Sequence, residues 1–318
     1  MRCLLLTFDC LPRRWIGCYG SLDSTTRGFD RLAAVGTIFD NAISPDVRPA
    51  AAAIAGFHLA GPGQILAGVQ SVPFSSQFFP ASEESSGRSK AHKRSRSRLT
   101  QTLHQASSWM REQNGPCLAW VRHPGLRLAP EPLSAAADVE TVLEQQAVID
   151  EELDAFLDEW LDCADERWTF LLTSGRGVLR TRPTIRRRAE QTPSISDDLA
   201  RVPLLALEGR GVGFGRRRLD LLPTTAVAAS IVSGEAGDST GLVARLETLP
   251  GVESVCIQAD ERAVAIRSAD WLFVRSIAPD REAGDGQLYR KPEDACDVFD
   301  VRSTQADEAV RLDSLIEA

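Results

Sequence analysis

Several features that define particular protein classes are missing from this sequence. No apolar run approaches the roughly 20 residues that a membrane-spanning helix needs, so we expect no membrane partner. The apolar N-terminal stretch before Asp9 is too short for a signal peptide, and no small-residue cleavage site follows it. The 7 cysteines form no Cys-x-x-Cys pair, which argues against disulfides and structural zinc. We therefore expect reduced thiols and a cytoplasmic protein.

Lysine is also scarce, and arginine supplies nearly all of the positive charge. With 36 basic and 44 acidic residues the formal net charge is -8, which excludes a general polyanion binder. The apolar share of 43% and the charged share of 25% exclude a disordered, collagen-like or coiled-coil chain. A length of 318 residues is typical of two domains, or of one large α/β domain with an appendage.

Short apolar runs alternate with helix-like segments through the first two-thirds of the chain. Cys3–Phe8 is apolar without polar alternation, which indicates a buried strand, and Asp9 follows at its carboxyl end. The alternation predicts an α/β domain over residues 1–235, with a mostly parallel sheet and helices on both faces. The other expected strands are Thr37–Ile43, Cys117–Val121, Trp168–Thr173 and Val202–Leu207; the expected helices are Thr26–Gly36, Pro49–Gly56, Leu99–Met110, Val139–Cys163 and Leu219–Val232.

Two other regions differ in composition. Residues 236–318 hold short strand-like segments, Gly251–Gln258, Ala263–Arg267 and Trp271–Ser276, which predict a small C-terminal antiparallel subdomain. Residues 60–98 are rich in Gly, Ser and Pro and predict a mobile loop, which ends in Arg88–Arg98 with six basic residues and no acid. A solvated loop is the plain interpretation. Binding of nucleic acid or another polyanion is the alternative, although the run offers no aromatic side chains for base stacking.

Short segments over nearly the whole chain resemble the sulfatase family, within the alkaline-phosphatase-like superfamily, and follow the family's order. One is the opening strand that leads to Asp9, and another is Gly17-Cys-Tyr-Gly20, which resembles the family's GCYG. The resemblance implies the family's α/β fold and hydrolysis of sulfate esters, in which a formylglycine attacks sulfur and calcium polarises the sulfate oxygens. The other segments are Thr26–Ala42, Trp168–Gly175, Arg201–Leu204, Leu219–Thr224, Ala263–Ser268 and Gln287–Asp294.

The resemblance places the family's four metal-ligand positions on two pairs of residues. The first pair is Asp9 and Cys10, after the opening strand, and the second is Gly175 and Arg176. Only Asp9 offers the hard oxygen ligand that calcium prefers, since a thiol binds calcium poorly and glycine has no side chain. Arg176 is always charged and repels a cation. We therefore expect no cofactor, or calcium only if the family's metal site survives.

The nucleophile motif that the family implies, Cys/Ser-x-Pro-x-Arg, has no complete counterpart in residues 44–56. Alignment on Gly56 places Asp46 at the nucleophile position, alignment on Pro49 places Val47 there, and alignment on Arg48 places Ser44 there. No register supplies nucleophile, proline and arginine together. The register therefore stays open.

Two further residues complete the set of candidates. His123, before Pro124, resembles the family's Pro-His segment and is a candidate acid or base. Arg48 and Arg176 are candidate clamps for an anionic ligand, with the Arg176 guanidinium standing in for the metal's charge.

Three functional hypotheses follow from these residues. The first is a catalytically degenerate sulfatase homologue with a binding or regulatory role, because residues that specify the fold persist while those that only chemistry needs are missing. The second is a divergent hydrolase of sulfuric or phosphoric esters, with Ser44 or Asp46 as nucleophile. The third is polyanion binding through the 88–98 basic run. The sequence names no substrate, partner or oligomeric state.

Overall fold

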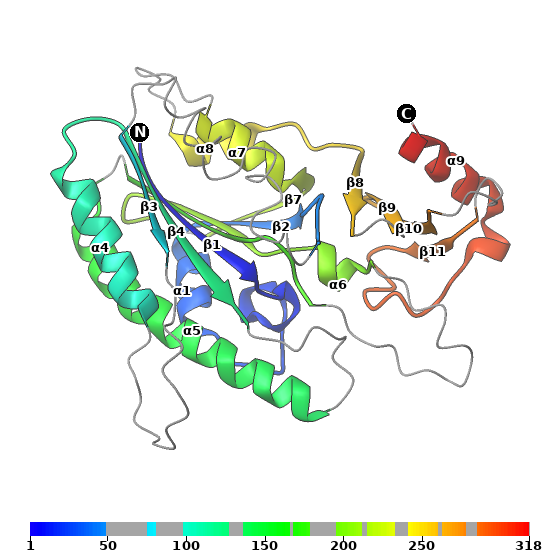
Figure 1. Ribbon diagram of the computed structural model, residues 1–318, viewed down its shortest axis with the longest axis horizontal. Helices are drawn as coiled ribbons and strands as arrows, with labels where there is room; N and C mark the ends of the chain where they lie inside the picture. The colour runs from blue at the N-terminus through cyan, green and yellow to red at the C-terminus, as the bar shows by residue number, and fades with distance from the viewer. Residues whose placement is uncertain are drawn as a thin grey trace.

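The computed structural model describes residues 1–48, 75–80, 98–126, 136–165, 168–178, 195–211, 215–232, 241–259, 263–277 and 285–317. Their strands form two separate sheets (Figure 1). The larger sheet has seven strands in the order β3-β4-β1-β5-β6-β2-β7. They are β1 (Arg2–Cys10), β2 (Thr37–Ile43), β3 (Ser75–Pro80), β4 (Cys117–Gly125), β5 (Trp168–Ser174), β6 (Leu204–Glu208) and β7 (Arg216–Pro223).

Most neighbours in the larger sheet are parallel. β3, β4, β1 and β5 run in one direction, and β2 and β7 are parallel to each other. β6 is antiparallel to both of its neighbours, so that β2 and β7 point the same way as β1. The prediction of a mostly parallel α/β sheet is therefore confirmed, and the carboxyl ends of six strands meet at one edge. Ligands of open α/β sheets bind at this edge.

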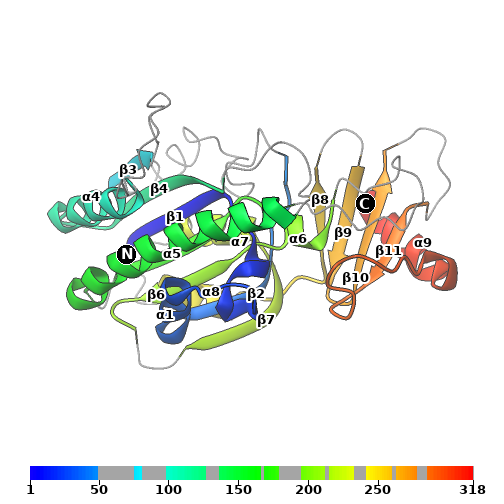
Figure 2. The ribbon, with the colours of Figure 1, turned by 90° about the horizontal axis from the view of Figure 1, so that it is seen from below.

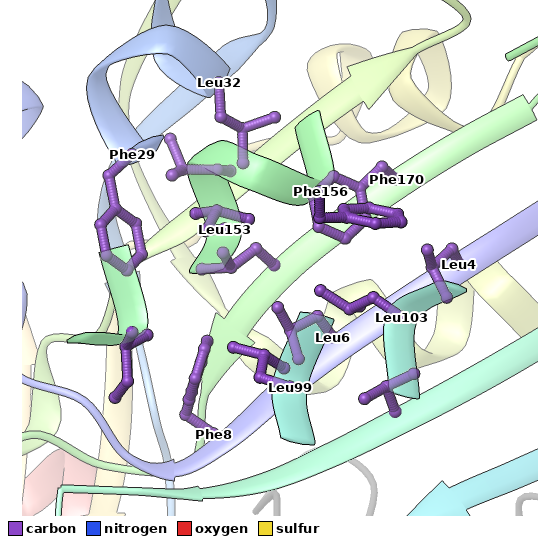
Figure 3. Close-up of a cluster of buried hydrophobic side chains, with 14 of the residues drawn as sticks. Leu4, Leu6, Phe8, Phe29, Leu32, Leu99, Leu103, Leu153, Phe156 and Phe170 are labelled. Carbon is purple, nitrogen blue, oxygen red and sulfur yellow. The ribbon is translucent and has the colours of Figure 1, made fainter. Parts of the chain in front are cut away.

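Helices cover both faces of the larger sheet, as predicted. α1 (Arg27–Val35), α4 (Arg98–Glu112) and α5 (Ala136–Cys163) pack on one face, and α7 (Thr224–Val232) and α8 (Leu242–Thr248) on the other. Successive side chains of β1 alternate between two buried clusters, which explains why this strand is apolar without interruption. Figure 3 shows the first cluster, where Leu4, Leu6 and Phe8 meet side chains of α1, α4 and α5.

A glycine and a carboxylate join α1 to α5. A Cβ atom on Gly28 would lie 2.5 Å from the Asp150 carbonyl oxygen, so only glycine lets the two helices approach this closely. The Asp150 carboxylate accepts a hydrogen bond from the Phe29 N–H at 2.9 Å, and burial raises the pKa of Asp150. α5 thus satisfies a backbone donor in the first turn of α1 that no intrahelical carbonyl can reach.

The smaller sheet lies beside the larger one and consists of β8 (Ser254–Gln258), β9 (Ala263–Ser268), β10 (Trp271–Ser276) and β11 (Gln287–Arg290) (Figure 2). All of its pairings are antiparallel, which confirms the predicted C-terminal antiparallel sheet. α9 (Ala306–Glu317) packs against it through Ala309 and Leu312. The sequence analysis did not predict this helix, although Ala309, Leu312 and Ile316 recur at helical spacing within the polar C-terminal stretch.

Other predictions differ from the structure or fall outside it. The predicted helix Leu219–Val232 is wrong in its first part, since Leu219–Pro223 belong to β7 and the helix begins at Thr224. Part of the predicted 60–98 loop, Ser75–Pro80, is strand β3. The predicted helix Pro49–Gly56, most of the 88–98 run and the proposed 235/236 boundary lie outside the described residues. Within the described residues, no helix is long and apolar enough to cross a membrane.

Candidate functional site

The carboxyl ends of β4, β1 and β5 bring together the residues at the four implied ligand positions. Phe8 of β1 lies opposite His123 of β4 and Ser174 of β5, and Asp9 and Cys10 are the last two residues of β1, between these two strand ends. The Gly175 N–H donates to the Phe8 carbonyl at 2.7 Å and holds the turn after β5 against β1. We call Asp9, Cys10, Arg122, Gly175 and Arg176 the strand-end site.

The Asp9 carboxylate is bound by an arginine of the neighbouring strand. Arg122 of β4 donates from Nε to Asp9 Oδ1 at 2.7 Å and from Nη2 to Oδ2 at 3.0 Å. Arg122 lies opposite Thr7, so Arg122 and Asp9 are diagonal neighbours on one face of the sheet. Both carboxylate oxygens therefore accept charge-assisted hydrogen bonds in the parallel geometry that arginine favours.

Cys10 is a buried thiol with a protein partner. Its Sγ lies 3.3 Å from the Gly177 carbonyl oxygen, to which the thiol donates. Burial raises the pKa of Cys10 to about 11, with the Arg176 charge opposing the rise and the Asp9 charge adding to it. Cys10 is therefore a neutral thiol near neutral pH, and both Asp9 and Arg176 lie close enough to act on it electrostatically.

The turn after β5 fixes the backbone around Arg176. The Leu11 N–H donates to the Arg176 carbonyl at 3.0 Å, and the Ser174 hydroxyl donates to the same carbonyl at 2.7 Å. The Arg176 side chain is half-buried, and its Nε is inaccessible to water and makes no hydrogen bond with any residue that the structure describes. An arginine nitrogen held in this way favours an anionic partner.

His123 points to the opposite face of the sheet from Asp9. It lies opposite Phe8, with the two rings edge to face at a centroid distance of 5.5 Å, and Phe8 belongs to the core under α1, α4 and α5. Its Nδ1 accepts a hydrogen bond from the Gly125 N–H at 3.0 Å. The acid or base role expected for His123 therefore concerns a buried ring whose Nδ1 is already engaged.

The three candidates after β2 lie three strands away from Asp9, because β5 and β6 separate β1 from β2. The Ser44 hydroxyl donates to the Asp46 carbonyl at 3.0 Å. The Asp46 carboxylate accepts from the Arg48 backbone N–H at 3.0 Å and from its Nε at 2.9 Å. Ser44, Asp46 and Arg48 thus form a local cluster, and the expected Arg48–Arg176 pair comes from two different strand ends.

Backbone hydrogen bonds tie this segment to the smaller sheet. The Val47 N–H donates to the Gln258 carbonyl at 2.8 Å, and the Gln258 N–H donates to the Pro45 carbonyl at 2.9 Å. The end of β2 therefore extends the edge of β8. The arrangement gives the segment a clear structural role in joining the two sheets.

The strand-end site does not fit calcium. Of its four implied ligands, Asp9 is engaged by Arg122, Cys10 is a neutral thiol, Gly175 has no side chain and Arg176 is a cation. In the part of the chain that the structure describes, no group of three or more His, Cys, Asp or Glu side chains could hold a metal ion. Two guanidinium groups at this edge make it favourable for an anion and unfavourable for a dication.

Arg122 is the residue of this site that the sequence analysis missed. Pairing with Asp9 depends on the β1–β4 register, which a single sequence does not give. One pattern does point to it: Arg122 is a charged residue at the end of an otherwise apolar strand, and such a charge needs a partner.

Comparisons with known proteins agree with this fold. No family model matches the sequence, and no curated protein sequence matches it. Among solved structures, a 2-O GAG sulfatase matches with a TM-score of 0.67 and 12% identity, covering 99% of this chain and 92% of that one. The phosphonate monoester hydrolase of Agrobacterium radiobacter matches with a TM-score of 0.63 and 13% identity, covering 99% and 94%. An alkaline phosphatase superfamily protein from Vibrio parahaemolyticus matches with a TM-score of 0.60 and 12% identity, covering 99% and 86%.

These matches and the sheet topology define an α/β fold with a mostly parallel sheet. The fold is that of the sulfatases and of the alkaline phosphatase superfamily, as the sequence resemblance implied. Because the identities are low, the likeness describes the fold, and function has to come from the side chains.

Proposed function

We propose that this protein is a catalytically degenerate member of the sulfatase-like proteins, which acts by binding rather than by hydrolysis. The observation that carries the proposal is the two-point contact of Arg122 with Asp9, the last oxygen ligand of the implied metal site. A calcium ion at Asp9 would have to displace Arg122 and would then lie close to a second cation, Arg176. Electrostatic repulsion and the loss of two charge-assisted hydrogen bonds both oppose that exchange.

The ligand that suits the strand-end site is an anionic group at Arg176. Support comes from the Arg176 Nε, which is inaccessible to water and has no hydrogen-bond partner. Arg48, the other candidate clamp, already binds Asp46 through its Nε and backbone N–H, so it contributes less. A ligand held by Arg176 needs no metal, which separates this proposal from the family's chemistry.

The direct test is calorimetric titration of the protein with calcium, together with assays of sulfate and phosphate ester hydrolysis. We expect no calcium binding, no rise in melting temperature with calcium, and no turnover. A ligand that binds only the folded state must raise the apparent stability, so the thermal measurement is a second readout. Calcium binding that Asp9→Ala abolishes would contradict the proposal, as would any hydrolysis lost in that variant.

Hydrolysis without calcium would instead favour the divergent hydrolase. That mechanism needs Ser44 or Asp46 as nucleophile and His123 as acid or base, so turnover should fall in Ser44→Ala, Asp46→Asn or His123→Ala. Asp270→Asn, a change in a turn of the smaller sheet, is a control that should leave turnover unchanged.

A cytoplasmic location is part of the same proposal. Six cysteines are free thiols, at positions 3, 10, 18, 117, 256 and 296. Cys3 and Cys117 lie close enough on β1 and β4 for one to raise the pKa of the other, after burial as the main cause, yet they form no disulfide. Reduced, closely spaced thiols are typical of a reducing compartment. Thiol counting on protein purified from its own cells under denaturing conditions tests this location.

A further inference from the structure

A pocket of about 360 Å³ lies at the same edge of the larger sheet, outside the strand-end site. Its walls come from the segment that follows β1, including the short helices η1 (Arg13–Trp15) and η2 (Gly17–Tyr19), and from α6 (Asp197–Ala200) before β6. Its lining residues are Arg13, Arg14, Tyr19, Gly20, Ser21, Leu22, Asp23, Asp197, Asp198, Arg201 and Ala295. We call it the arginine pocket. Neither Asp9 nor Arg176 lines it.

Arg13 lines the pocket between the Tyr19 ring and Asp40, and its Nε makes no hydrogen bond with the described residues. Its guanidinium lies over the Tyr19 ring at 4.4 Å, and its Nη2 donates to Asp40 Oδ1 at 3.0 Å. Its Nε is inaccessible to water and has no hydrogen-bond partner. The Tyr19 hydroxyl in turn donates to the Leu204 carbonyl at 2.9 Å, which fixes the ring under the guanidinium. The cation is thus positioned by stacking rather than fully neutralised.

Arg201 enters the pocket from the other wall. Its Nε donates to the Asp40 carbonyl at 2.9 Å, and its Nη1 lies 3.6 Å from Asp197 Oδ2. Burial lowers the pKa of Arg201 to about 10, and the positive charge of Arg13 lowers it further, while Asp197 opposes the change. The charges of Arg13 and Arg201 therefore act against each other across the pocket.

The ion pairs around the pocket contain more arginines than aspartates. Among the described residues, these ion pairs join five arginines to three aspartates; the arginines are 13, 14, 201, 217 and 267, and the aspartates are 40, 197 and 198. Each of these aspartates already has an arginine partner. The remaining acid of the lining, Asp23, is exposed. The network by itself carries two positive charges more than negative ones.

We propose that the arginine pocket binds an oxyanion, the sulfate or phosphate group of a small molecule, between Arg13 and Arg201. A volume of about 360 Å³ lies within the range of roughly 300–1,000 Å³ that small-molecule pockets occupy. Guanidinium groups recognise tetrahedral oxyanions through paired hydrogen bonds, and an anion here would relieve the repulsion between the two arginines. The inference goes beyond the proposed function, because it holds whether or not the strand-end site binds or reacts.

The experiment is isothermal calorimetry of the full-length protein with inorganic phosphate and with sulfate, at an ionic strength kept constant with chloride. We expect saturable binding of at least one of the two, and a rise of at least tenfold in the dissociation constant for Arg13→Gln. Arg13→Lys keeps the charge but loses the planar, stacked fork, so its affinity should lie in between. Arg311→Gln, an exposed arginine of α9, is the control and should bind as the unmodified protein does.

Two further variants keep the test decisive. Asp23→Asn removes the one exposed negative charge of the lining without touching an ion pair, and should tighten binding about two- to threefold by removing a repulsion. It remains informative if Arg13→Gln does not fold. Arg176→Gln removes the anion site proposed at the strand ends and should leave the Arg13-dependent binding in place, because Arg176 does not line the arginine pocket.

The contrary outcomes are equally clear. Binding that Arg176→Gln abolishes and Arg13→Gln does not would assign the anion to the strand-end site and overturn the pocket proposal. So would a complete lack of binding, or an affinity that Asp23→Asn and Arg13→Gln leave unchanged. The calcium and hydrolysis assays do not report on this pocket, so failure of either proposal is distinguishable from failure of the other.

Discussion

Two arginine–aspartate pairs of similar geometry stand in very different surroundings. Arg122 and Asp9, in the strand-end site, lie 2.7 Å apart with side chains 37% and 27% exposed. Arg267 of β9 and Asp197 of α6 also lie 2.7 Å apart, but are 2% and 5% exposed. Exposed pairs contribute about 0–1 kcal/mol, whereas breaking a buried one costs about 3–5 kcal/mol. The first pair should therefore contribute little to stability, and the second should contribute much more.

The buried pair belongs to a larger inter-sheet cluster. Asp297 accepts a hydrogen bond from the Asp197 N–H at 2.8 Å and also binds the Lys291 ammonium, which is fully buried. Burial raises the pKa of Asp197, but the charges of Arg267 and Lys291 outweigh it and lower the value to about 2. The cluster links the segment before β6 to the smaller sheet. We call Asp197, Arg267, Lys291 and Asp297 the inter-sheet cluster.

The largest predicted effect comes from breaking the buried pair of Arg267 and Asp197. Arg267→Met keeps much of the side-chain volume but leaves the Asp197 carboxylate buried without its main partner, so the free energy of unfolding should fall by about 3–5 kcal/mol. Urea unfolding followed by circular dichroism measures the loss. The double variant Arg267→Met with Asp197→Asn should recover part of it, because no buried charge is left. A cost no larger than that of Arg122→Met would show that burial does not distinguish the two pairs.

The backbone at Gly125, the last residue of β4, packs closely against Cys10 of the strand-end site. Gly125 has φ of +73°, and a Cβ atom there would lie 2.0 Å from the Cys10 carbonyl oxygen. Gly125→Ala should therefore cost about 2–3 kcal/mol, from backbone strain and from displacement of β1. Gly20→Ala is the matched control, since its φ is +95° with nothing within 4 Å of the added atom. Gly20→Ala should cost only about 1–2 kcal/mol, and equal losses in the two variants would argue against a close approach at Gly125.

The two aspartates of the inter-sheet cluster should act on stability in opposite pH windows. Burial raises the pKa of Asp297 to about 6 from 3.8, despite the attraction of Lys291, so the folded protein holds this proton more tightly than the unfolded chain. Its contribution to stability therefore falls as pH rises from about 4 to about 6. Asp197 behaves in the opposite way. Because its pKa is lowered in the folded state, its ionised carboxylate contributes stability above about pH 4, and this contribution is lost as pH falls towards 2.

Melting temperature measured against pH at constant ionic strength tests both windows. Asp297→Asn should flatten the profile between pH 4 and 6, because the variant lacks the carboxyl that titrates there. A variant profile that keeps the unmodified slope in that range would assign the slope to other groups.

The comparison also shows what a single sequence can and cannot give. β2 and β10 match their predicted bounds to the residue, because Gly36 and the Ser268–Asp270 turn interrupt the chain just before them. The helix predicted from Leu219 was wrong at its start, since the apolar end of β7 runs into α7 without a polar gap. Local pattern is sufficient where a turn marks the boundary and misleads where two apolar elements join.

The candidate site could be predicted only in part. The residues at the four implied ligand positions are readable from the sequence, and so is the poor fit to calcium. The partner of Asp9 could not be predicted. Arg122 lies 113 positions further along the chain, and only the register between β1 and β4 brings it beside Asp9. The arginine pocket is likewise assembled from Arg13 and Arg201, which no local pattern connects. Contacts between distant segments are the part of the site that requires the folded structure.

The smallest predicted effect concerns the exposed pair. Arg122→Gln should change the free energy of unfolding by less than about 1 kcal/mol, because solvent screens a pair that is about a third exposed. It frees the Asp9 carboxylate, yet calcium should still not bind, since Cys10, Gly175 and Arg176 supply no further oxygen ligand. Calorimetry with calcium on Arg122→Gln, and on Arg122→Gln with Arg176→Asn, measures this. Calcium binding to the single variant would mean that Arg122 alone excludes the metal, so that one substitution separates a metal site from an anion site.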